Sequence, residues 1–345
     1  MKIQRLYTLV IAVSVWLMCA TASHASSSKL LVEEFMVPAT DPDVQLFVRN
    51  KRPADLSHFT PDNVVLFVHG ATTPSETTFD QKFDGLSWMD DLANHGFDVY
   101  LVDIRGYGKS SRPKAMSEPP AANPPQVRTV TAAKDFGSAV DFILKRRQIP
   151  SLNVIGWSWG TAITALYTTQ HNDKVNRLVL YAPIWLRDQK STNKKDKPVD
   201  AYRYVQPEKV VQFLLKGAPE GKELMPAAWQ EQWIQATYTT DPDGFKANPK
   251  YVRAPNGVKQ DQREYWMSGK PIYDPANIRR PTLIILGAWD AVTPVKFAKA
   301  IFDKLENAYP KSLVVLNEGT HGLLMQNNRM EMFASVQKFL ERSPE

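Results

Sequence analysis

One serine, one histidine and one aspartate occur in an order that could support nucleophilic catalysis. Ser158 lies in LNVIGWSWG (152–160), where an apolar run ends between two tryptophans and glycines stand two residues to either side of the serine. Gly-x-Ser-x-Gly between a strand and a helix is typical of a sharp turn that exposes a nucleophile at strained φ and ψ angles. A helix starting at Trp159 would also point its N-terminal dipole at a nearby oxyanion. The alternative is a serine that only caps this helix.

A serine hydroxyl is a weak nucleophile and needs a base nearby. His321, in NEGTHGLL (317–324), follows the last apolar run and precedes the last helical pattern, which is where such a turn requires its base. His69 follows an earlier apolar run, and we interpret it as an organiser of its own loop. The remaining histidines lie in polar segments, in a helix-end turn or in the N-terminal segment: His24, His58, His95 and His171.

The third group should be an acid between the serine and the histidine in sequence. Asp290 ends PTLIILGAWD (281–290), at the carboxyl end of an apolar run. There it would hold the tautomer of His321 and stabilise the imidazolium. The alternative is a cap for the helix that begins near Pro294. Two other acids are weaker candidates, because one lies outside a strand and the other is too close in sequence to the histidine: Asp188 and Glu318.

A tetrahedral oxyanion needs backbone donors. The residue after the nucleophile, Trp159, should supply one N–H group. The loop after VVLFVHG (64–70) should supply the other, and we assign it to Ala71, with Thr72 as the alternative.

The elements that would position these residues alternate along the chain. Continuous apolar runs are typical of parallel strands that are covered on both faces. Helical patterns lie between the runs, which indicates right-handed βαβ crossovers and an α/β fold with a mostly parallel sheet. The predicted strands are 45–50, 63–70, 97–104, 151–158, 177–183, 281–290 and 311–319, and the predicted helices are 129–147, 159–170, 294–307 and 329–342.

Two stretches interrupt this alternation. Residues 184–276 contain no clear strand, are rich in aromatic residues, and have helical patterns at 205–217 and 226–238. They predict a helical cap inserted into the core, whose aromatic side chains either line an apolar substrate site or pack the cap onto the body. Residues 112–126 carry five prolines and predict an ordered, extended loop near the edge of the sheet.

The N-terminus has the layout of a secretory signal peptide. Two basic residues precede the 15-residue apolar run at 6–20, and small residues follow it. We expect cleavage after Ala25 or Ala22, which gives a signal peptide at 1–25, a core at 26–183 and 277–345, and export to the periplasm or the medium. A membrane anchor is the alternative, although the run is shorter than the ~20 residues that span a bilayer. Cleavage would remove Cys19, the only cysteine, which excludes thiol chemistry.

Five motifs together resemble the α/β-hydrolase-fold serine hydrolases: FVHG (67–70), VDIRGYGKSSRP (102–113), VIGWSWG (154–160), LGAWDAVTP (286–294) and GTHGLL (319–324). The resemblance covers about residues 45–343. It implies an eight-stranded, mostly parallel sheet with helices on both faces and a helical cap after the sixth strand. A serine nucleophile argues against the dehalogenases and epoxide hydrolases of this fold. The sequence Ser-Trp-Gly is similar to that of prolyl aminopeptidases, but their Gly-Gly-Pro-Gly signature is absent after His69.

The expected reaction is hydrolysis of a carboxylic ester through an acyl-enzyme, with a small-molecule substrate that is apolar or aromatic and large enough for the cap to cover. We place Trp157, Thr72 and Trp185 in its pocket. A lactonase or amidase would use the same catalytic residues. An aminopeptidase would need an acid in the cap, for which the candidates are Glu208, Glu231 and Glu264. A non-enzymatic relative would usually lack one of the three catalytic groups, and all three are present here. The net charge of +6 is interleaved with acids, which argues against a nucleic-acid partner. No pattern indicates a metal or an organic cofactor, and no membrane anchor would remain after signal cleavage.

Overall fold

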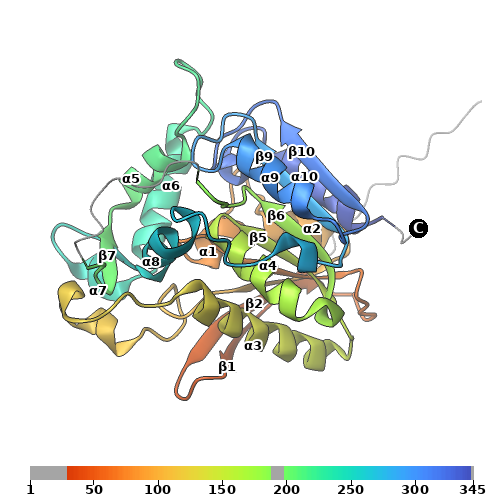
Figure 1. The fold of residues 1–345 in the computed structure, drawn as a ribbon, viewed down its shortest axis with the longest axis horizontal. Helices are drawn as coiled ribbons and strands as arrows, with labels where there is room; N and C mark the ends of the chain where they lie inside the picture. Colours follow the sequence, from red (N-terminus) through yellow and green to blue (C-terminus); the bar gives the residue numbers. More distant parts are fainter. Residues whose placement is uncertain (1–28, 188–197, 343–345) are drawn as a thin grey trace, which may run out of the picture.

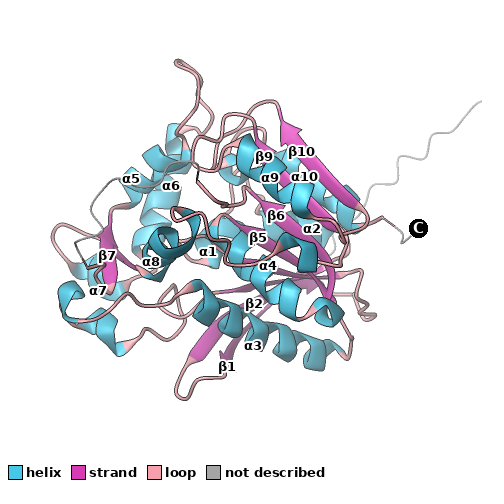
Figure 2. Ribbon diagram, in the orientation of Figure 1, coloured by secondary structure: helices cyan, strands magenta, loops and turns pink. Residues whose placement is uncertain are grey.

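The computed structural model describes residues 29–187 and 198–342, so the predicted signal peptide and Asp188 lie outside the described residues. Eight strands form one sheet in the order β1-β2-β4-β3-β5-β6-β9-β10 (Figures 1 and 2). The first three of these strands pair antiparallel, and all the others pair parallel. The strands are β1 Leu30–Pro38, β2 Gln45–Pro53, β3 Val64–Val68, β4 Asp98–Val102, β5 Leu152–Trp157, β6 Val175–Tyr181, β9 Thr282–Gly287 and β10 Lys311–Leu316.

The predicted mostly parallel sheet is confirmed, and the strand that the sequence reading missed is β1. Val32 and Met36 on β1 are about half exposed, because an edge strand of this kind alternates between packed and solvated positions. By contrast, every residue of the central strands β3, β4, β5 and β9 is buried. Strands without a solvent face give the continuous apolar runs from which the sheet could be predicted.

Helices cover both faces of the sheet (Figure 1). On one face α3 (Thr129–Arg147) packs against α4 (Trp159–Gln170), and α9 (Val295–Lys304) lies against β9 and β10. On the other face α2 (Trp88–Asn94) packs against α10 (Arg329–Leu340), where the rings of Trp88 and Phe333 stack at 4.9 Å. Across the described ranges, no helix combines the length and the apolar character needed to span a bilayer.

Between β6 and β9 the chain leaves the sheet and forms a layer beside the carboxyl ends of the strands (Figure 1). We call its described residues, 198–276, the cap segment. The expectation of no strand here is wrong, because β7 and β8 form a small antiparallel sheet. Each has only four residues, too few to show an alternating pattern. The cap elements are β7 Tyr202–Val205, α5 Pro207–Leu214, α6 Ala227–Tyr238, α7 Pro242–Lys246, β8 Val252–Pro255 and α8 Gly257–Asp261.

The proline-rich loop 112–126 is ordered and contacts the cap segment. It contains two short 3₁₀ turns, at Lys114–Ser117 and Pro120–Ala122. Two of its carbonyl groups accept hydrogen bonds from the cap segment: Met116 from the guanidinium of Arg253 at 2.9 Å, and Glu118 from the hydroxyl of Tyr202 at 2.8 Å. The loop therefore fastens the cap segment to the core.

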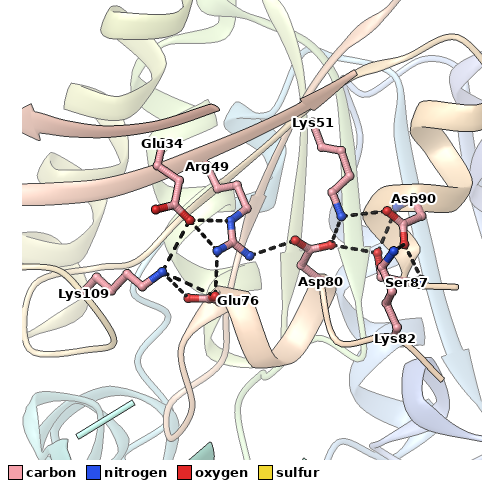
Figure 3. Close-up of polar contacts among 9 residues, drawn as sticks. All are labelled: Glu34, Arg49, Lys51, Glu76, Asp80, Lys82, Ser87, Asp90 and Lys109. Carbon is pink, nitrogen blue, oxygen red and sulfur yellow. Dashed lines mark hydrogen bonds and ion pairs between the residues drawn. The ribbon is translucent and has the colours of Figure 1, made fainter. Parts of the chain in front are cut away.

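An ion-pair network joins β2 to the chain between β3 and α2 (Figure 3). Arg49 contacts Glu34, Glu76 and Asp80 at 2.5, 2.7 and 2.9 Å. Lys51, two residues further on the same face of the strand, is buried and contacts Asp80 and Asp90. Four basic and four acidic side chains balance one another in this cluster, which we call the β2 ion network: Glu34, Arg49, Lys51, Glu76, Asp80, Lys82, Asp90 and Lys109.

Candidate active site

Ser158 occupies the strained turn that its flanking glycines predict. Its φ and ψ angles are 55° and −115°, between the end of β5 and the start of α4. A Cβ atom on Gly156 would lie 2.4 Å from the carbonyl oxygen of Gly160, and one on Gly160 would lie 2.5 Å from the carbonyl oxygen of Val68. Neither contact is possible, so only glycine fits at these two positions. The hydroxyl of Ser158 makes no capping bond to α4.

The structure brings Ser158, His321 and Asp290 into one hydrogen-bonded chain. The Oγ atom of Ser158 lies 2.8 Å from Nε2 of His321, and Nδ1 of His321 lies 2.9 Å from Oδ2 of Asp290. His321 and Asp290 are both buried. A proton on Nδ1 that points at the carboxylate leaves Nε2 as an acceptor for the serine hydroxyl.

The surroundings of Asp290 keep its carboxylate ionised. Burial by itself raises the pKa of Asp290, but the charge and hydrogen bond of His321 and the hydrogen bonds of Thr293 outweigh this, so the pKa is lowered. Oδ1 accepts from the N–H groups of Val292 and Thr293, both at 2.8 Å, and Oδ2 accepts from the Thr293 hydroxyl at 2.7 Å. Asp290 therefore fixes both the turn before α9 and the ring of His321. Its two expected roles, as the acid beside His321 and as a cap for the helix, are compatible.

Two backbone N–H groups beside Ser158 are available as donors. Within the described residues, neither the N–H of Trp159 nor that of Ala71 donates a hydrogen bond. A Cβ atom on Gly70 would lie 3.3 Å from Cβ of Ser158, so the loop that carries Ala71 packs directly against the serine. This matches the arrangement expected of an oxyanion hole.

His69 fixes the peptide unit that carries the Ala71 N–H. Nδ1 of the fully buried ring lies 2.7 Å from the Gly70 carbonyl oxygen, which belongs to the same peptide unit as the Ala71 N–H. Nε2 accepts the N–H of Ile104 at 3.1 Å. Burial lowers the pKa of His69 to about 4, although the bond to Gly70 raises it. The neutral ring thus binds backbone on both sides, in agreement with its interpretation as a loop organiser.

A cavity of about 400 Å³ opens over Ser158 and His321. Its walls come from the core loops on one side and from the cap segment on the other. Thr72, Trp157 and Trp185, the residues expected in a substrate pocket, all lie in its lining. Trp157 also donates from Nε1 to the carbonyl oxygen of His321 at 3.1 Å, so it both lines the cavity and braces the loop that carries the base.

The aromatic residues after β6 divide between the two roles that the sequence left open. Trp185 and Trp266 line the cavity, as does Phe213 from α5. Trp229 lies 5.1 Å from Phe83 between ring centroids, and Trp233 donates from Nε1 to the carbonyl oxygen of Thr77 at 3.0 Å. One group therefore shapes the cavity, and the other packs the cap segment onto the core.

The sequence reading missed four basic side chains in the cavity lining. They come from the loop after β6, from β7, from α5 and from α8: Arg187, Arg203, Lys209 and Lys259. None of the described lining residues is Asp or Glu. Because these cations are spread over more than seventy residues of sequence, no local pattern connects them, and only the folding of the cap segment brings them together.

The acids considered in the sequence lie elsewhere. Glu208 accepts from the hydroxyl of Tyr238, Glu231 from Gln235, and Glu264 from Arg128 and Gln260. Glu318 forms a surface ion pair with Lys222 at 3.2 Å. In the part of the chain that the structure describes, no group of three or more His, Cys, Asp or Glu side chains could hold a metal ion.

Fold and site geometry together define the class of protein. The model of the α/β hydrolase fold family matches residues 63–328, so the chain belongs to this family and is a hydrolase of this fold. The match includes the predicted nucleophile, acid and base in the family's order.

Individual relatives are more distant. A 2-hydroxy-6-oxo-6-(2'-aminophenyl)hexa-2,4-dienoic acid hydrolase from Metapseudomonas resinovorans is 23% identical over 248 residues, which are 71% of this chain and 74% of the relative. The crystal structure of a bacterial membrane phospholipase A has a TM-score of 0.59 at 18% identity and covers 90% of this chain and 86% of that one. An esterase from Exiguobacterium antarcticum has a TM-score of 0.57 at 18% identity and covers 90% of this chain and all of the esterase. At these identities the likeness to solved structures shows the fold alone.

Proposed function

We propose that the protein hydrolyses carboxylic esters through an acyl-enzyme on Ser158. The observation that carries the proposal is the chain of 2.8 and 2.9 Å contacts from Ser158 through His321 to Asp290. Ser158 and His321 line a cavity, beside two backbone N–H groups that donate to no described residue. Such a chain activates a serine hydroxyl. The cavity volume is within the range of small-molecule sites.

The proposed reaction follows from the positions of the protons. Nε2 of His321 takes the hydroxyl proton of Ser158 as Oγ attacks the ester carbonyl carbon. The oxyanion that forms is stabilised by the N–H groups of Ala71 and Trp159, and the ionised Asp290 stabilises the imidazolium. His321 then gives its proton to the departing alkoxide. A water molecule, deprotonated by the same histidine, attacks the acyl carbon; the C–O bond to Ser158 then breaks, His321 returns the proton to Oγ, and the carboxylic acid is released.

Replacing Ser158 with Ala tests this proposal. We expect turnover of 4-nitrophenyl butyrate to fall by about 10⁴-fold or more, as is typical when a member of such a triad is removed. Labelling by a fluorophosphonate should be lost in the same variant. Ser335→Ala is the matched control and should keep both, because the Ser335 hydroxyl only donates to the carbonyl oxygen of Glu331 one turn earlier in α10. Wild-type turnover in Ser158→Ala would refute the assignment.

The alternative reactions differ in what they require of the cavity. A lactonase or amidase would use the same groups, and a substrate panel distinguishes it from an esterase. An aminopeptidase would need a carboxylate to hold the substrate ammonium group, but Glu208, Glu231 and Glu264 are outside the lining. We therefore expect proline naphthylamide to be a much poorer substrate than short acyl esters. Faster cleavage of the naphthylamide would reverse this ranking.

We also infer that the protein is exported and acts in the periplasm or the medium. The support is the sequence of the first 25 residues, with its basic start, apolar run and small residues. Mass spectrometry of the N-terminus of the secreted or periplasmic protein should find a chain that begins at Ser26 or Ser23. A cell-retained protein that still begins at Met1 would contradict export.

A further inference from the structure

The cavity over Ser158 has an unbalanced charge. Arg187, Arg203, Lys209 and Lys259 contribute to its lining, and no Asp or Glu of the described residues does so. None of these four side chains forms an ion pair with a described carboxylate, whereas Arg49 of the β2 ion network contacts three. Cations that face a largely apolar cavity without a partner raise the electrostatic potential there, and the low dielectric of the walls strengthens the effect.

Arg203 places one of these charges next to the predicted oxyanion loop. Its Nη2 atom donates to the carbonyl oxygen of Ala71 at 2.8 Å and to the hydroxyl of Thr72 at 3.0 Å. Its Nη1 atom donates to the carbonyl oxygen of Pro255 at 2.9 Å. These acceptors are neutral, so they fix the position of the guanidinium but leave its charge uncompensated. Burial lowers the pKa of Arg203, with a small opposing effect from Tyr107.

Lys259 adds a second charge beside the first. It is an exposed residue of α8 that lines the cavity; partial burial and the charges of Arg203 and Arg263 lower its pKa, while Asp200 raises it. A lysine close to an arginine is unfavourable, because like charges repel. An anion bound between them would remove this repulsion.

Arg187 and Lys209 reach the same cavity from two other elements. Arg187 follows β6, and its guanidinium carbon lies 5.9 Å from the ring of Phe297, another lining residue. Lys209 is exposed on α5. Both have charged groups that make no hydrogen bond with the described residues, so both can donate to a ligand.

From this arrangement we propose that the cavity selects esters that carry a second, free carboxylate. This carboxylate binds to the four lining cations while Ser158 attacks the ester carbonyl. The proposal rests on the proposed ester hydrolysis for its kinetic consequence, but the anion site itself can be tested without turnover. The apolar walls would hold the carbon chain between the two groups, and an ammonium-bearing substrate would be repelled.

The kinetic test compares two esters that differ in one charge. The first ester is 4-nitrophenyl glutarate, which has a free carboxylate, and the second is the neutral 4-nitrophenyl pentanoate. The ratio of their kcat/KM values, glutarate over pentanoate, should fall about tenfold in Lys259→Gln and in Arg187→Gln. That is the change expected when one charge-assisted contact is lost. Lys299→Gln, an exposed lysine on α9 outside the lining, is the matched control and should keep the wild-type ratio. An unchanged ratio in both cavity variants overturns the proposal.

The binding test uses Ser158→Ala and does not depend on catalysis. Calorimetric titration should give tighter binding of benzoate than of its neutral analogue benzamide, and adding Lys259→Gln should reduce that preference about tenfold. If the wild-type protein hydrolysed neither ester, the proposed function would fail, yet a benzoate preference that Lys259→Gln reduces would still support the anion site. Equal binding of benzoate and benzamide overturns the anion site, whatever the esterase activity.

Discussion

The β2 ion network and the cavity lining each contain four basic side chains, but among the described residues only those of the network have carboxylate partners. In the network, Lys51 is buried between Asp80 and Asp90, and Arg49 is held by three acids (Figure 3). In the cavity, Arg203 is held by carbonyl oxygens, and the ammonium group of Lys259 has no described acid within ion-pair distance.

The difference indicates what each set of charges does. Paired, buried charges fix the positions of the elements that carry them, because breaking one pair leaves the other charge without compensation. Here the network secures α1 (Ser75–Phe79), which directly follows the loop of Ala71. Unpaired charges around a cavity contribute nothing comparable to folding and instead attract a ligand of opposite sign. The two clusters should therefore respond in opposite ways to loss of a cation.

The largest effect on stability is expected from Lys51→Met. Removing this cation leaves two carboxylates with almost no side-chain exposure short of one ion-pair partner each: Asp80 keeps only Arg49, and Asp90 keeps only the exposed Lys82. The free energy of unfolding should fall by about 3 kcal/mol or more, the typical cost of breaking a buried ion pair from one side. Urea denaturation measures it, with Lys82→Met as the control, because that lysine is 56% exposed and should cost less than ~1 kcal/mol. Equal losses in the two variants would remove the distinction between buried and exposed members of the network.

A much smaller effect is expected from Lys259→Met in the cavity. No ion pair with a described residue is lost, and repulsion from Arg203 is relieved, so the free energy of unfolding should stay within about 0.5 kcal/mol of wild type or rise. The same urea titration measures this change. A loss approaching that of Lys51→Met would mean that the cavity lysine has a structural partner, and the contrast between the two clusters would disappear.

The smallest effect is a difference in pH dependence. The pKa of Lys259 is lowered by burial and by neighbouring cations, so between this pKa and the unfolded value near 10.4 the unfolded chain binds more protons than the folded one. Stability should therefore rise with pH across this window in the wild-type protein relative to Lys259→Met. Paired urea titrations at pH 8 and pH 10 measure the difference. A wild-type protein that loses stability relative to the variant would show that the sign is wrong.

Asp90 of the β2 ion network should make stability depend on pH in the acid range. Burial by itself raises its pKa, but the charge and hydrogen bond of Lys51 outweigh burial and lower it. The stabilisation from this carboxylate is therefore present above the unfolded pKa near 3.9 and is lost as the pH falls through the lowered folded value. Lys51→Met should weaken this acid-side dependence, which unfolding measured between pH 5 and pH 3 would detect.

The mostly parallel sheet could be predicted because its central strands are buried on both faces and form continuous apolar runs in the sequence. The strained turn at Ser158 could be predicted because backbone contacts leave room only for glycine at Gly156 and Gly160. These features depend on residues close together in the sequence. The helix α3, predicted at 129–147, has those bounds in the structure because its basic last turn and its apolar spacing are also local.

The features that the sequence did not predict depend on contacts between distant residues. Strands β7 and β8 are 46 residues apart, and each is stabilised by the other and by loop 112–126. The four cavity cations share no spacing, and nothing in a single sequence distinguishes Lys259 from a solvated surface lysine. Whether a charged side chain has an ion-pair partner can be seen only in the folded structure.

The most direct measurement on the central claim is to trap the acyl-enzyme. The protein is mixed with 4-nitrophenyl glutarate, quenched in acid within the first turnovers, digested and analysed by mass spectrometry. We predict a glutaryl group on the peptide that contains Ser158, and none in Ser158→Ala. A wild-type protein that releases 4-nitrophenol without a covalent adduct, or with an adduct on another residue, would contradict the account.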